Sequence, residues 1–158
     1  KRSTVARRVE RRMRIHQISR LSDYIRLLRE RPEELTALFE DILINVTQFF
    51  RDPTVYALFR DQVIPSLLAT KKARKQRLVR LWSAGCATGE EPYSLAMSML
   101  DGIARSKSHD TMLSVVGTDI DRNALAVAKK GEYPARLLNQ ISATDRHRYV
   151  ETDRESSA

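Results

Sequence analysis

Hydrophobic positions in the first third of the chain recur at roughly helical spacing and predict three short helices. One covers residues 5–18, with arginines on its other face, and a second begins after Ser22. Pro32 opens a third that runs to Leu43, because proline is favoured in the first turn of a helix. Each helix is apolar on one side only, so we expect a small bundle. The stripes consist of Val5, Val9, Met13, Ile15 and Ile18, then Tyr24, Ile25, Leu27 and Leu28, then Leu35, Leu38, Phe39, Ile42 and Leu43.

In the second half the pattern changes to the alternation that is typical of a β-strand. Residues 78–84 alternate, a glycine-rich turn follows, and residues 92–105 return to helical spacing. A second apolar strand over residues 113–117 leads to a helix over residues 122–130, which Gly131 ends. This order of elements predicts a parallel βαβ unit of the Rossmann-like kind.

The segment between these regions divides the chain. Residues 45–51 read N-V-T-Q-F-F-R and predict a polar loop, and the helix that follows over residues 53–68 is expected to kink or shorten at Pro65. Residues 71–77 are basic and lack periodicity, so they are the predicted linker. We therefore expect a helical N-terminal domain over residues 1–70, a linker over 71–77 and a partial α/β domain over 78–158.

The turn at residues 85–89 has the composition of a nucleotide-binding loop, with Gly85 and Gly89 at its ends. Glu90 and Glu91 follow at the helix start, where carboxylates repel phosphate and so disfavour ATP or NAD. S-adenosylmethionine fits better, because it has no phosphate and carries a sulfonium, an ammonium and a ribose diol. The alternative is an ordinary strand-to-helix turn whose acidic residues complement the helix dipole.

The acidic residue Asp119 lies directly after the second strand, in the segment T-D-I-D. In nucleotide-binding folds a carboxylate at this position accepts hydrogen bonds from a ribose diol. Asp121 has instead the place of a cap for the following helix. Asp119 is therefore the candidate ribose-binding residue.

The net charge of +8 lies within residues 1–31, where eleven basic residues accompany three acidic ones. A localised basic surface predicts an acidic partner, either nucleic acid or an acidic protein face, whereas a run of charge taken alone favours a solvated helix face. Tyr24 is the only aromatic residue in this region, so stacking on nucleic-acid bases is poorly supported. The candidate docking residues are Arg7, Arg8, Arg11, Arg12 and Arg14.

The composition excludes several other classes. No apolar run approaches the roughly 18 residues of a membrane span, so no insertion into a membrane is expected. Cys86 is the single cysteine, which favours a reducing cytoplasm. His16, His109 and His147 lack the spacing of metal ligands, so no metal is expected.

Four motifs together resemble the chemotaxis receptor methyltransferases, the CheR-type protein-glutamate O-methyltransferases. They are N-V-T-x-F-F-R-D from Asn45, W-S-A-x-x-x-T-G-E-E-P-Y-S from Trp82, T-D-I-D from Thr118, and A-x-x-G-x-Y from Ala128 to Tyr133. The resemblance implies an all-helical N-terminal domain and a Rossmann-like, class I methyltransferase domain. It also implies S-adenosylmethionine as methyl donor and glutamates on the cytoplasmic helical bundle of chemoreceptors as acceptors. By position it assigns cofactor contacts to Asn45, Thr47, Arg51, Glu91 and Asp119, and a catalytic role to Arg51.

The resemblance departs from the family pattern towards the end of the chain. A small β-subdomain, an Asn-Leu pair and an R-N-V-x-I-Y-F segment belong to the family but do not occur here. We therefore expect a domain truncated at its C-terminus, inactive on its own. Two alternatives to the parent enzyme stay open: a non-catalytic module that binds a receptor or another acidic partner, and a nucleic-acid methyltransferase.

Overall fold

The computed structural model describes residues 4–43 and 46–152, which form two compact units, Lys1–Asn45 and Val46–Ala158. This division differs from the expected linker at residues 71–77. Residues 64–73 form a helix whose Ile64 and Leu68 are buried in the core of the second unit. The residues before this helix consequently belong to the second unit as well, because burial of its apolar face fixes it there.

The first unit consists of three helices, as the hydrophobic pattern predicts, but the first ends at Ile15 and not at Ile18, and the second begins at Leu21, before Ser22. They are α1 (Thr4–Ile15), α2 (Leu21–Glu30) and α3 (Pro32–Ile42). Helix α3 packs against both of the others. It buries Leu38 and the carboxylate of Glu34, α2 buries Tyr24, and α1 has no fully buried residue. The core of this unit is therefore small and contains a charge.

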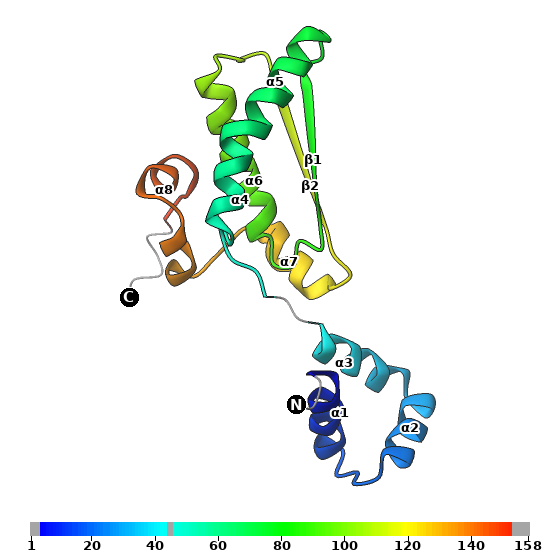
Figure 1. The fold of residues 1–158 in the computed structure, drawn as a ribbon. Coiled ribbons are helices and arrows are strands. Elements are labelled where there is room, and N and C mark those ends of the chain that lie inside the picture. The colour runs from blue at the N-terminus through cyan, green and yellow to red at the C-terminus, as the bar shows by residue number, and fades with distance from the viewer. Residues whose placement is uncertain (1–3, 44–45, 153–158) are drawn as a thin grey trace. The chain divides into compact units, whose positions relative to one another are not determined.

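The second unit is built on two parallel strands, as predicted. Strand β1 (Leu78–Ala84) pairs with β2 (Met112–Thr118) in a register that runs from Leu78 opposite Met112 to Ala84 opposite Thr118. Helix α6 (Glu90–Arg105) makes the crossover and begins two residues earlier than expected. Val79 of β1 packs with Met99 and Ile103 of α6 in the main apolar cluster. Figure 1 shows α5 and α6 on one side of the two strands.

The opposite face of the sheet is exposed within the described residues. Trp82 is 71% exposed, Met112 59% and Val116 50%. Alternate residues of a strand point to opposite faces, so these side chains share the face that α5 and α6 leave uncovered. This face is mostly apolar, although Arg80 and Ser114 share it, and two strands form the sheet within the described residues.

The helical segment before β1 is continuous but changes its hydrogen-bonding pattern. Helix α4 (Pro53–Leu58) passes into the π-helical turn η1 (Phe59–Val63) and then into α5 (Ile64–Ala73). The N–H of Ile64 donates to the carbonyl of Phe59, five residues back, and Pro65 has no N–H to continue an ordinary ladder. The kink expected at Pro65 is thus a widened turn just before it. The helix does not shorten, and residues 71–73 are helical where a linker was expected.

Beyond β2 lie α7 (Arg122–Lys130), the 3₁₀ turn η2 (Ala135–Gln140) and α8 (Ala143–Tyr149). Asp121 caps α7 by accepting from the N–H groups of Asn123 and Ala124, and Gly131 ends the helix with a φ of 68°, as predicted. The sequence pattern did not predict η2 or α8. Both are short, and α8 is held on α6 through the Tyr149 hydroxyl, which donates to Asp101 at 2.9 Å.

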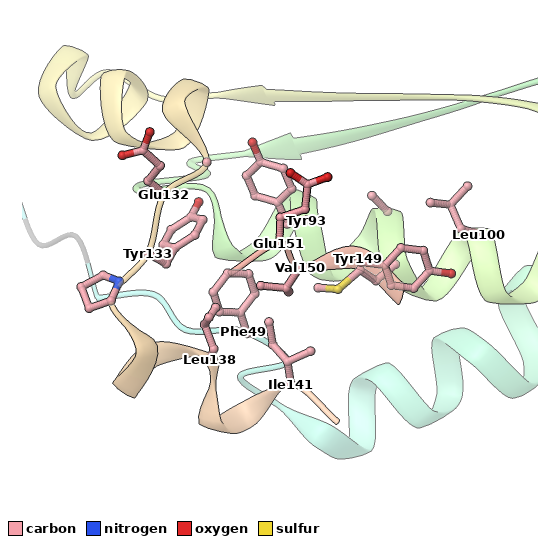
Figure 2. A pocket seen from close by; sticks show the side chains of 14 residues that line it. Phe49, Tyr93, Leu100, Glu132, Tyr133, Leu138, Ile141, Tyr149, Val150 and Glu151 are labelled. Atoms are coloured by element: carbon pink, nitrogen blue, oxygen red, sulfur yellow. The ribbon is translucent and has the colours of Figure 1, made fainter. Parts of the chain in front are cut away.

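A cavity of about 870 Å³ lies between α6 and the segment that contains η2 and α8. Phe49, Met97 and Ile141 form a second apolar cluster at its wall, and Figure 2 shows Phe49, Tyr133 and Leu138 gathered around it. No helix in the described ranges, 4–43 and 46–152, is long and apolar enough to cross a membrane.

Candidate functional site

The turn after β1 places two glycines in conformations that only glycine adopts readily. Gly85 has a φ of 74°, and a Cβ there would meet nothing within 4 Å. Gly89 has a φ of 101°, and a Cβ there would lie 2.7 Å from the Tyr133 hydroxyl and 2.9 Å from Cα of Ala128. Gly85 therefore leaves open space above the turn, whereas Gly89 allows the chain behind the turn to pack closely.

Hydrogen bonds join this turn to the end of β2. The N–H groups of Gly85 and Cys86 donate to the carbonyl of Thr118 at 2.8 and 3.0 Å. Asp119 accepts from the N–H of Ala87 at 2.7 Å through one carboxylate oxygen and from the N–H of Asp121 at 2.8 Å through the other. The carboxyl ends of the two parallel strands thus form one rigid edge, where ligands bind in open α/β sheets.

Asp119 therefore has a structural task that the sequence did not reveal. Its carboxylate connects the two strand ends, and each oxygen that accepts one N–H keeps a further lone pair. This arrangement leaves acceptors for a hydroxyl group. Its role toward a ribose stays a prediction.

The two glutamates at the start of α6 have different surroundings. Glu90 is 3% exposed and accepts from the Thr88 hydroxyl at 2.6 Å. Glu91 is exposed and accepts from the Ser83 hydroxyl of β1 at 2.7 Å. Only Glu91 thus presents a carboxylate at the surface of the turn, which agrees with its place among the predicted cofactor residues and leaves that role untested.

The loop before α4 is anchored beside the same turn. The N–H of Phe50 donates to the Ser94 hydroxyl of α6 at 3.0 Å, and Ser94 donates in turn to the carbonyl of Glu90 at 2.6 Å. Arg51 follows directly, is exposed and donates to the carbonyl of Val46 at 3.0 Å. Phe50 has a φ of 51°, an unusual value for a bulky side chain and one that is concentrated at functional sites.

Tyr133 also supports the turn, although it lies far from it in sequence. Its hydroxyl donates to the carbonyl of Thr88 at 2.6 Å, and its ring packs edge to face on Phe49 with centroids 5.0 Å apart. Burial, and then the charge of Glu90, raise the pKa of Tyr133, so its hydroxyl stays a donor at neutral pH. The motif A-x-x-G-x-Y marked Tyr133, but nothing local in the sequence indicated this contact.

The structure thus brings together most of the predicted cofactor residues. Gly85, Gly89, Glu91 and Asp119 lie at the strand ends, and hydrogen bonds attach the loop of Arg51 to the adjoining start of α6. Thr47 is half-buried in that loop, and Asn45 lies outside the described residues. The 870 Å³ cavity is a different place, since Gly85, Glu91 and Asp119 are not among its lining residues.

The predicted docking arginines belong to the first unit, and one of them has another role. Arg12 donates through Nε to Oε1 of the buried Glu34 at 2.9 Å and pairs through Nη2 with the other oxygen. The Tyr24 hydroxyl and His16 also contact Glu34, at 2.8 and 2.6 Å. The hydrogen bond from Arg12 is the main cause that lowers the pKa of Glu34 to about 2. Arg12 is therefore mostly engaged inside the unit, with its side chain 17% exposed, and its place in the docking set stays a prediction.

The remaining four arginines keep a surface position. Arg7, Arg11 and Arg14 are exposed and Arg8 is half-buried. Arg11 forms one weak pair, with Asp41 at 3.4 Å, and its side chain is still 57% exposed. This face stays available for an acidic partner.

A glycine turn and a strand-end carboxylate on a parallel βαβ unit are typical of domains that bind a nucleoside-containing cofactor. Comparison with known families agrees and is more specific. Residues 45–158 match the family described as CheR methyltransferase, SAM binding domain, and residues 1–43 match CheR methyltransferase, all-alpha domain. The chain belongs to the CheR methyltransferase family.

Among individual relatives, two are named chemotaxis protein methyltransferases and one is uncharacterized. Chemotaxis protein methyltransferase 2 of Pseudomonas aeruginosa is 32% identical over 142 residues, which cover 90% of this chain and 48% of that protein. A chemotaxis protein methyltransferase of Listeria monocytogenes is 37% identical over 106 residues, 67% of this chain and 37% of that protein. An uncharacterized 104.1 kDa protein of Rhodobacter capsulatus is 38% identical over 149 residues, 94% of this chain and 15% of that protein. The chain thus spans about half or less of these relatives' length.

Proposed function

We propose that the protein to which this chain belongs methylates glutamate side chains on the cytoplasmic helices of chemoreceptors, in the cytoplasm, with S-adenosylmethionine as donor. The observation that carries the proposal is the joined edge at the ends of β1 and β2, where Asp119 holds the glycine turn. The family and the names of the relatives support methyl transfer in chemotaxis.

The residues at this edge fit S-adenosylmethionine. The space above Gly85 allows a ligand to approach the backbone, and the carboxylates of Glu91 and Asp119 suit hydroxyl and ammonium groups better than phosphate. We assign the ribose to Asp119. By the family resemblance, Glu91, Asn45, Thr47 and Arg51 make the other contacts.

The proposed methyl transfer requires little acid–base catalysis by the protein. When bound, S-adenosylmethionine would supply a methyl group on a sulfonium; its transfer to a carboxylate oxygen breaks the S–CH3 bond and leaves a neutral thioether and a methyl ester. A surface glutamate is already ionised near pH 7, so no general base is required and alignment is the main contribution. Arg51 donates one N–H to the carbonyl of Val46, and this bond orients its guanidinium. Its other N–H groups are left to hold the acceptor carboxylate.

The basic face of α1 completes the proposal. Arg7, Arg8, Arg11 and Arg14 would attract the acidic methylation region of a receptor bundle, and the charge excess of the chain is concentrated near them.

We further propose that the 158-residue chain is inactive by itself. Its two-stranded sheet leaves strand edges exposed, which should also favour association between copies. Methyl transfer to receptor membranes by the isolated chain would contradict this.

Calorimetry with the full-length protein tests the cofactor assignment. Asp119→Ala should weaken binding of S-adenosylmethionine by about tenfold or more, through loss of the ribose contact and of the bond that holds the turn. Asp110→Ala is the matched control. The side chain of Asp110 is 83% exposed, and its ion pair with Arg77 is weak because the two groups are 3.8 Å apart. Unchanged affinity in Asp119→Ala would remove the assignment.

A further inference from the structure

A second, smaller cavity lies beside the loop of residues 46–52, here called the Arg51 loop. It has a volume of about 380 Å³ and is lined by residues of this loop, of α4 and η1, and of the segment around η2. Two guanidinium groups, those of Arg51 and Arg60, line it together with a single carboxylate, that of Asp145. Its charge is therefore positive on balance.

The carboxylate of Asp145 is already engaged. It accepts from the Ser142 hydroxyl at 2.8 Å, and the N–H of Asp145 donates back to the same hydroxyl at 3.0 Å as part of the cap of α8. Neither arginine pairs with it. Asp145 consequently does not neutralise the two guanidinium groups.

Arg60 has an unusual position on its helix. It lies within the π-helical turn η1, and such turns occur mostly as single insertions that recur at functional sites. Arg60 lines the cavity from this turn, together with Tyr56 of α4. Arg60 is half-buried, and its side chain makes no hydrogen bond or ion pair with any residue that the structure describes. A half-buried guanidinium without an anionic partner is a strong candidate to bind one.

The wall of the cavity is held in place by two amide side chains. Gln140 donates to Gln48 at 3.2 Å, and Gln48 donates to the carbonyl of Arg51 at 3.4 Å. These bonds join the Arg51 loop to η2, although Gln48 and Gln140 are 92 residues apart in the chain. Arg51 is therefore presented by a loop that is hydrogen-bonded to η2, and Arg60 by the continuous helical segment of α4, η1 and α5.

We propose that Arg60 acts with Arg51 to bind carboxylate side chains of the acidic polypeptide that the enzyme methylates, and so sets its preference for acidic sequence. The inference rests on the function proposed above and adds a substrate-binding residue to it. Arginine suits this role because its planar fork binds a carboxylate through two N–H groups at once. Arg51 would hold the carboxylate that accepts the methyl group, and Arg60 a neighbouring one.

Peptide binding tests the inference separately from methyl transfer. The probes are a glutamate-rich helical peptide and its counterpart with glutamine at the same positions, and the measurement is fluorescence anisotropy with the full-length protein at low salt. The wild type should prefer the glutamate peptide by about tenfold, and Arg60→Gln should reduce that preference to about twofold. Arg105→Gln is the matched control, because Arg105 is exposed at the end of α6 and does not line the cavity.

Two further measurements separate the possible causes of a loss. Arg60→Lys keeps the charge without the planar fork and should retain part of the preference, and unchanged S-adenosylmethionine affinity shows that the fold is intact. A wild type that binds both peptides equally, an Arg60→Gln variant with full preference, or equal losses in Arg60→Gln and Arg105→Gln would each overturn the inference. Displacement of the peptide by inorganic phosphate but not by chloride would identify a phosphate site and overturn it as well. Failure of receptor methylation with the peptide preference intact would instead count against the proposed function alone.

Discussion

The two units of this chain use charge in opposite ways. In the first unit the interior contains Glu34 with its partners Arg12, Tyr24 and His16, and few apolar side chains are fully buried beside them. In the second unit the main interior cluster is apolar, and the charged residues lie at the strand ends. The same residue type, arginine, thus stabilises the fold in one unit and is exposed beside the predicted cofactor site in the other.

This difference shows why a basic stretch is a poor guide to a binding surface by itself. Arg11 and Arg12 are neighbours in the sequence, yet the side chain of Arg11 is 57% exposed and that of Arg12 is 17% exposed. Helical periodicity directs Arg12 toward α3, where a buried carboxylate meets it. A charge excess therefore has to be divided into interior and surface parts before it predicts a partner.

Among these variants, we expect Glu34→Ala to cause the largest difference in stability between the two units. Without this carboxylate the partly buried Arg12 and the buried Tyr24 lose their common partner, which should cost the first unit about 3 to 5 kcal/mol of its free energy of unfolding. Hydrogen exchange in the intact chain should show faster exchange over residues 4–43 and little change around Val79. Glu33→Ala is the control, since Glu33 is exposed on the same turn. Equal exchange in both variants would show that the ion cluster does not stabilise the unit.

A low pH should weaken the first unit before the second. The pKa of Glu34 is lowered to about 2, so its contribution is complete above the ordinary pKa of about 4.5 and is lost as the pH falls from there toward 2. The loss amounts to about 3 kcal/mol, since each pKa unit corresponds to about 1.4 kcal/mol. Circular dichroism and hydrogen exchange between pH 6 and 2.5 would follow it, with Glu34→Gln as the variant in which this pH dependence disappears. A first unit that keeps its protection at pH 2.5 would contradict the assignment.

The two glycines of the turn after β1 should differ in how strongly an added methyl group destabilises the second unit. Gly89→Ala should cost about 2 to 3 kcal/mol, because its positive φ is combined with close contacts to the Tyr133 hydroxyl and to Cβ and Cα of Ala128, which cannot all withdraw. Gly85→Ala should cost only about 1 kcal/mol, since its positive φ is the sole penalty there. Urea unfolding monitored over the second unit measures both. Equal costs would mean that the close packing behind Gly89 relaxes freely.

The smallest effect per residue is expected on the basic face of α1. Replacing Arg7, Arg11 and Arg14 by Glu should raise the KM for receptor about tenfold at low salt, because single surface ion pairs contribute only about 0 to 1 kcal/mol and are screened by salt. Cofactor affinity should not change. The matched control replaces Arg20, Arg26 and Arg29, which are exposed on or beside α2. Equal receptor methylation by the two triple variants would show that the basic face of α1 is an ordinary solvated surface without a docking role.

Local sequence signals predicted much of this molecule. Helical spacing and Pro32 indicated the three N-terminal helices, alternation indicated both strands, and Asp121 and Gly131 marked the two ends of α7. These signals work because caps, turns and periodic burial depend on residues only a few positions apart. The four motifs added the family, which the matches over residues 1–43 and 45–158 confirm.

The tertiary structure alone decided which distant residues meet. Phe50 and Ser94 are 44 residues apart, Tyr133 and Thr88 are 45 apart, and Arg12 and Glu34 are 22 apart. No local pattern distinguishes Arg12 from Arg11, or the helix over residues 64–73 from one that would pack on α3. The free energy that selects these partners comes from burying particular side chains together, and that burial exists only once the elements have been assembled.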